Sequence, residues 1–174
     1  RIVGAEAEAE KTRGEAMAET RRATARGGLS HVRGALETGA RIEGALADLA
    51  SAGVSVPAEL TEQSAGVPSL ANLRTAFPEA ARDALALSLR DTAGDGMIDR
   101  TLAFLRSQSG ARSLSPRAGD DPDAVLSRSE AALGVGDVAT AISELSGLPE
   151  SGKARMAEWI GLAQRRMAAT EAVA

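Results

Sequence analysis

The sequence predicts an all-α protein in which a helical stalk is followed by an amphipathic helix and a small C-terminal helical bundle. Two observations lead to this prediction. Aromatic residues make up only 2% of the 174 residues, while alanine and glycine are abundant. That composition favours close-packed helices, because β-branched and aromatic residues dominate strands. Apolar residues also recur at every third or fourth position along much of the chain, which is the spacing of one helix face.

Residues 1–53 are predicted to form the stalk. Residues 1–26 alternate Glu, Ala and Arg at spacings that allow ion pairs within one helix, which indicates a solvated helix at the end of a coiled coil. Because the chain starts inside this helix-like run, we expect it to be a piece of a longer protein. Gly27-Gly28 is expected to break the helix. A second helix is then predicted from Leu29 to about Ala52, and its apolar stripe consists of Leu29, Val32, Leu36, Ile42, Leu46 and Leu49.

Residues 54–118 are predicted to form a second region. Val54–Pro57 is expected to be an extended linker, since residues before proline avoid the α conformation. A helix begins near Pro68, and Pro78 either kinks this helix or starts a new one. One face of this helix carries Leu70, Leu73, Ala76 and Phe77, and after Pro78 the helical region runs on through Leu85, Leu87 and Leu89.

A short amphipathic helix is predicted next, over about Met97–Gln108. Residues 95–118 contain four arginines and two aspartates, within a chain whose net charge is −4. Basic amphipathic helices lie in membrane interfaces, with apolar side chains under the headgroups and arginines on anionic phosphates. An ordinary helix that packs on its own domain is the alternative. The candidate membrane-binding residues are Met97, Ile98, Arg100, Leu102, Phe104, Leu105, Arg106 and Arg112.

The last region, residues 119–174, has the clearest helix boundaries. Asp121 is an expected N-cap followed by Pro122 at the first helical position, and Asp137 is expected to cap the next helix. Pro149 precedes a third helix. Three helices with short connections must pack antiparallel in a small bundle. Its predicted core residues are Leu126, Leu133, Ile142, Leu145, Trp159 and Ile160.

Several classes of function are not expected from these residues. The chain has no cysteine and a single histidine, His31, and it contains no P-loop or nucleophile motif. Asp91 and Asp95 fall at positions of a calcium loop, but Ala93 and Leu102 occupy two positions that need an oxygen ligand. We therefore predict no catalytic residues, no metal ligands and no cofactor. The negative charge also argues against a nucleic-acid partner.

An ordered set of short motifs runs through the chain. It comprises Gly66-Val-Pro-Ser-Leu70, Leu73–Arg82, Gly96-Met-Ile-Asp-Arg100, Asp121-Pro-Asp-Ala-Val-Leu126, Gly136-Asp137, Leu148-Pro149 and Trp159. In this order and spacing the chain resembles the C-terminal part of mitofilin in its alphaproteobacterial form. That family is the bacterial relative of the mitochondrial inner-membrane protein that organises crista junctions. The resemblance covers about Leu36 to Met167.

The resemblance implies a non-enzymatic scaffold that shapes inner-membrane invaginations, with this fragment on the periplasmic side of the bacterial inner membrane. It implies membrane curvature through an amphipathic helix on anionic lipids, and residues 119–174 as the mitofilin-type domain. It also implies self-association, with a homodimer formed through Leu70, Leu73, Phe77, Leu85, Leu87 and Leu89. In mitochondria a cysteine-rich small protein binds the C-terminal domain, but no such partner can be identified from this sequence.

A helical-repeat adaptor for a protein partner is the other interpretation. Leu126–Leu148 is similar to a degenerate tetratricopeptide hairpin, with two helices of similar length and a Gly-Asp turn. However, no second copy recurs at the repeat period of about 34 residues.

Overall fold

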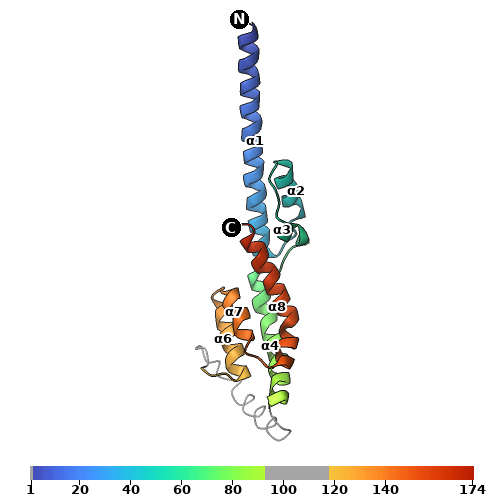
Figure 1. The fold of residues 1–174 in the computed structure, drawn as a ribbon, viewed down its shortest axis with the longest axis vertical. Coiled ribbons are helices and arrows are strands. Elements are labelled where there is room, and N and C mark those ends of the chain that lie inside the picture. Colours follow the sequence, from blue (N-terminus) through green and yellow to red (C-terminus); the bar gives the residue numbers. More distant parts are fainter. Residues whose placement is uncertain (1, 93–117) are drawn as a thin grey trace. The chain divides into compact units, whose positions relative to one another are not determined.

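The computed structural model describes residues 2–92 and 118–174, and all regular structure within them is helical (Figure 1). The predicted all-α class is therefore confirmed. The helices are α1 (Ile2–Thr38), α2 (Glu43–Ser51), α3 (Ala58–Glu62), α4 (Leu70–Thr92), α6 (Pro122–Gly134), α7 (Val138–Leu145) and α8 (Glu150–Glu171). They form two compact units, which are described separately. The first contains the residues up to Ser69 together with Ala168–Ala174, and the second contains Leu70–Met167.

The first unit has its core at the C-terminal end of α1. This core contains Val32, Leu36, Ile42, Leu46, Leu49, Leu60, Val67 and Ala169. The N-terminal part of α1 lies outside it: residues 4–23 are exposed apart from the half-buried Ala18.

The prediction that Gly27-Gly28 breaks the helix is wrong, since α1 is continuous through both glycines. At Gly28 the helix is supported by packing against a neighbouring helix. Gly28 is buried against α2, and a Cβ atom there would lie 2.9 Å from Leu49 Cγ. A helical glycine costs about 1 kcal/mol relative to alanine. At Gly28 the missing side chain also makes room for Leu49, so close packing offsets that cost.

The prediction of one helix from Leu29 to Ala52 is also wrong. α1 ends at Thr38, and Gly39 takes a positive φ of 80°, a conformation that terminates many helices. The chain then folds back into α2, and the backbone N–H groups of Ile42 and Glu43 both donate to the Ser64 carbonyl, at 3.1 and 3.2 Å. The predicted apolar stripe nevertheless lies in one core: its members on both sides of this turn are buried, except Leu29, which is half-buried against them.

The second unit consists of α4, α6, α7 and most of α8, and Phe77 and Trp159 lie in its core. Their ring centroids are 5.0 Å apart at an interplanar angle of 78°, an edge-to-face arrangement. The Trp159 indole Nε1 donates to the Leu73 carbonyl at 3.0 Å, so its polar atom is satisfied inside the core. Pro78 neither ends α4 nor starts a new helix, since α4 runs from Leu70 to Thr92.

The predicted helix boundaries of the C-terminal region are confirmed. The Asp121 carboxylate accepts from the backbone N–H groups of Asp123 and Ala124, both at 3.1 Å, with Pro122 at the start of α6. Asp137 caps α7, and α6 ends at Gly134 as expected.

The compact units differ from the predicted division at residues 53 and 118. α4 was expected in a separate region, but it supplies Leu73 and Phe77 to the same core as α6, α7 and α8. The apolar face of α4 is covered by the helices that follow it in sequence.

Candidate functional site

The predicted membrane-binding residues lie outside the part of the chain that the structure describes. They are Met97, Ile98, Arg100, Leu102, Phe104, Leu105, Arg106 and Arg112, and they fall in the segment that follows α4 and precedes α6. The membrane-interface interpretation therefore stays a prediction from the sequence.

Two of the six predicted dimerisation residues are buried within the single chain. Leu73 and Phe77 are each only 1% exposed in the single chain, because they pack in the core of the second unit. Leu70 and Leu85 are half-buried against the same core, and Leu87 and Leu89 are half-buried. In this structure, a second copy would find only these four leucines partly accessible.

The six predicted domain-core residues all belong to the second unit. Leu126, Leu133, Leu145 and Trp159 are buried in its core, while Ile142 and Ile160 are half-buried and pack against it. The six residues come from α6, α7 and α8, as the apolar periodicity indicated.

Charged side chains hold the helices of this second unit together. Arg74 on α4 donates to the carbonyls of Leu133 and Gly134 at 3.0 and 2.8 Å, which places a cation at the C-terminal end of α6. Arg128 on α6 pairs with Glu144 on α7 at 2.8 Å. Both arginines therefore make contacts between helices of this unit.

Arg155 on α8 donates from Nε and Nη2 to the same carboxylate oxygen of Asp83 on α4, at 3.1 and 2.7 Å. The hydrogen bond with this carboxylate, followed by its charge, raises the pKa of Arg155. Beside this pair is a hollow of about 220 Å³ between α4 and α8. Ala76, Ala80 and Leu162 contribute apolar lining, and Glu79 and Glu158 add negative charge.

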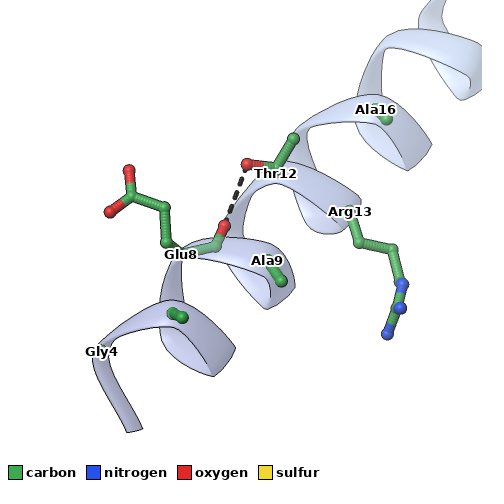
Figure 2. Close-up of a pocket in the computed structure, with 7 residues that line it drawn as sticks. Gly4, Glu8, Ala9, Thr12, Arg13 and Ala16 are labelled. Atoms are coloured by element: carbon green, nitrogen blue, oxygen red, sulfur yellow. Dashed lines mark hydrogen bonds between the residues drawn. The ribbon is translucent and has the colours of Figure 1, made fainter. Parts of the chain in front are cut away.

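The exposed part of α1 offers a different kind of surface. Figure 2 shows Gly4, Ala9 and Ala16 along one side of the helix, with Glu8 and Arg13 beside them. The Thr12 hydroxyl donates to the Glu8 carbonyl at 2.9 Å (dashed in Figure 2), a bond internal to the helix. All of the residues that line this shallow depression come from α1.

Within residues 2–92 and 118–174, no group of three or more acidic or histidine side chains is placed to hold a metal ion. No helix in the same ranges is both long and apolar enough to cross a bilayer. His31, the single histidine of the sequence, is exposed on α1.

Sequence reasoning missed the contribution of the C-terminus to the first unit. Ala169 is fully buried in the α1–α3 core, with Ala172 and Val173 packed against it. Arg33 on α1 donates to the Val173 carbonyl at 2.9 Å. Alanine and valine at the end of a helix carry no specific signal, so a contact across 140 positions could not be identified from the sequence.

Comparison of the chain with protein-family models, with curated proteins and with solved structures found no match to any of the three.

Proposed function

We propose that this chain is a non-enzymatic scaffold that self-associates and organises a bacterial inner membrane, on its periplasmic face. The observation that best supports the proposal is the N-terminal part of α1. Residues 4–23 are exposed, apart from the half-buried Ala18, and their helix continues without interruption into a packed core. A helix that projects so far from its own core is suited to hold modules apart or to pair with other chains.

The length of α1 supports a spacer role. At a rise of about 1.5 Å per residue, its 37 residues span roughly 55 Å. A single helix with no apolar face is only marginally stable in water, and most helical stability in proteins comes from packing. A second copy of the chain is the partner that we propose for residues 4–23 of α1.

The basic segment after α4 supplies the proposed membrane contact. Its apolar residues, Met97, Ile98, Leu102 and Leu105, would enter the interface beneath the headgroups, and Arg100 and Arg106 would meet anionic phosphates. Shallow insertion into one leaflet, reinforced by an oligomeric stalk, is a physical route to curvature.

The second candidate function is a protein adaptor without a membrane role. The hollow between α4 and α8 favours it, because an apolar lining edged by the acidic Glu79 and Glu158 and the basic Arg155 offers a partner both apolar and charged contacts. In this alternative the basic segment after α4 makes no lipid contact, so lipid binding discriminates between the two functions.

The membrane proposal is tested by sedimentation with anionic liposomes. Wild type is expected to pellet with vesicles that contain phosphatidylglycerol. Leu102→Glu/Leu105→Glu is expected to remain in the supernatant, because two carboxylates would have to enter the interface. Light scattering and far-UV circular dichroism on the same samples report oligomeric state and helix content.

The matched control is Ala103→Glu/Ser107→Glu, which adds the same charge on the opposite face of the predicted helix. This variant is expected to pellet like wild type. If wild type does not pellet, or if both variants lose binding equally, the amphipathic helix is not the membrane contact and the adaptor becomes the better model.

A further inference from the structure

The last seven residues of the chain complete a core that is otherwise built from the first 69. Ala169 is 0% exposed within the core formed by α1, α2 and α3. Its neighbour Ala168 is exposed, so one face of the terminal turn points into this core and the other faces solvent.

Two further contacts hold the same segment on α1. The Arg33 guanidinium donates to the Val173 carbonyl at 2.9 Å, close to the C-terminal end of α8. Cations are favourable at that end of a helix, because its last carbonyls lack partners within the helix. Val173 also packs against the apolar core.

We propose that residues 168–174 form a strap, a segment that closes the core at the base of α1 and can detach from it. The stability of the α1–α3 core then depends on whether residues 168–174 are docked on it. Any event that captures or displaces the strap would uncover apolar side chains of this core, including Val32 and Leu36, and loosen the base of the long helix. This device is independent of the membrane role, because residues 168–174 are not among the proposed lipid contacts.

The strap has a small footprint, which is why it can be released without unfolding the rest of the chain. Its fully buried side chain is an alanine, Ala172 and Val173 are half-buried, and the hydrogen bond from Arg33 is exposed. Segments with few buried contacts open locally at lower free energy than the core they cover. The second unit does not include the strap.

The test compares Ala169→Glu with Ala168→Glu in the full chain by hydrogen exchange. Both add one carboxylate at neighbouring positions of α8, but only Ala169→Glu places it in the α1–α3 core. We expect exchange of the amides around Val32–Leu36 and Leu46–Leu49 to accelerate about tenfold or more in Ala169→Glu. Ala168→Glu should leave these rates within about twofold of wild type.

A second pair of variants, with smaller expected effects, tests the proposal if Ala169→Glu does not fold. Arg33→Ala removes the bond to Val173, and the same amides should exchange about two- to tenfold faster, the range of one net hydrogen bond. Arg26→Ala removes an arginine that pairs with Glu19 on the same helix and should leave them unchanged.

Trp159 emission reports the second unit in every variant, since Trp159 is the only tryptophan and lies in that core. Unchanged emission together with faster exchange in α1 and α2 supports the strap. Unchanged exchange in both Ala169→Glu and Arg33→Ala would overturn it. Equal loss of protection in both units would also overturn it, because the segment would then be an ordinary part of α8.

Discussion

The N-cap of α7 rests on one side chain. The Asp137 carboxylate accepts from the Thr140 backbone N–H at 2.9 Å and from the Thr140 hydroxyl at 2.7 Å. These two bonds, the backbone one foremost, favour the charged form and lower the pKa of Asp137 below its ordinary value. A lowered folded-state pKa stabilises the protein above the unfolded pKa of about 3.9, and that stabilisation is lost as pH falls through the folded value.

We predict that Asp137→Asn makes the unfolding free energy of the second unit less dependent on pH in the acid range. Asparagine can still cap a helix but does not titrate, so the stability difference between wild type and variant should shrink as pH falls through the folded pKa of Asp137. At pH 6 wild type should be the more stable of the two, because its carboxylate is charged. Denaturant unfolding followed by Trp159 fluorescence between pH 2 and 7 measures the difference.

Glu130→Gln is the control for this prediction, since it removes the same charge from an exposed position on α6. Its stability should run parallel to wild type across the same pH range. If the difference in unfolding free energy between wild type and Asp137→Asn stays constant with pH, the charge of Asp137 does not contribute to the pH dependence of stability.

At the level of helices, Gly27 and Gly28 form an adjacent pair with different surroundings. A Cβ atom on Gly27 would meet nothing within 4 Å, whereas on Gly28 it would lie 2.9 Å from Leu49 Cγ and 3.2 Å from the Ala45 carbonyl. We predict that Gly27→Ala stabilises α1 by up to about 1 kcal/mol, the helix-propensity difference. Gly28→Ala should give no gain or a loss, because Leu49 and the α2 backbone must shift.

Hydrogen exchange of the α1 amides around Val32–Leu36 measures both variants on one scale. Slower exchange in Gly27→Ala alone is the expected result. Equal stabilisation by the two alanines would mean that α2 does not pack closely on Gly28.

The same helices show what the sequence could and could not predict. Asp121, Pro122 and Asp137 mark helix starts through bonds to the next few residues, so local reasoning placed them correctly. Gly28 looks like a breaker until the position of α2 is known, because its role is to admit Leu49. The sequence alone does not show which neighbour a glycine accommodates.

For the candidate site, too, the sequence predicted local features but not the partners of each residue. An apolar stripe on α4 predicts that Leu73 and Phe77 are buried, but not by what, and the structure buries them in their own chain. The strap was missed because Ala169 has no distinctive chemistry and its partners lie more than 100 positions earlier. The basic character of residues 95–118 could be read directly, since charge and apolar spacing are local properties.

For the molecule as a whole, the question is what stabilises the exposed part of α1. The ion pairs along it, Lys11–Glu15, Arg13–Glu10 and Arg22–Glu19, have N–O distances of 4.0, 3.3 and 3.7 Å and side chains that are at least 65% exposed. Surface pairs of this kind contribute about 0–1 kcal/mol each. They cannot by themselves hold some twenty residues in a helix against fraying.

We therefore predict that protection of residues 4–23 depends on protein concentration. In dilute solution these amides should exchange at nearly unstructured rates, while those around Val32–Leu36 stay protected by the α2 contact. As concentration rises, pairing of α1 with a second copy should slow exchange in residues 4–23, because binding stabilises the helix by mass action. Hydrogen exchange over a hundredfold range of concentration measures this directly.

Amides of α6 and α7 provide the internal control, since their helices are packed within the second unit and should show no concentration dependence. Fast exchange of residues 4–23 at every concentration would contradict self-association through α1. The remaining route to an oligomer would then be the half-buried leucines of α4, and the stalk would need a different partner to become ordered. Slowing confined to residues 4–23 would place the assembly contact on α1 and not on the basic segment after α4, which the membrane proposal reserves for lipid.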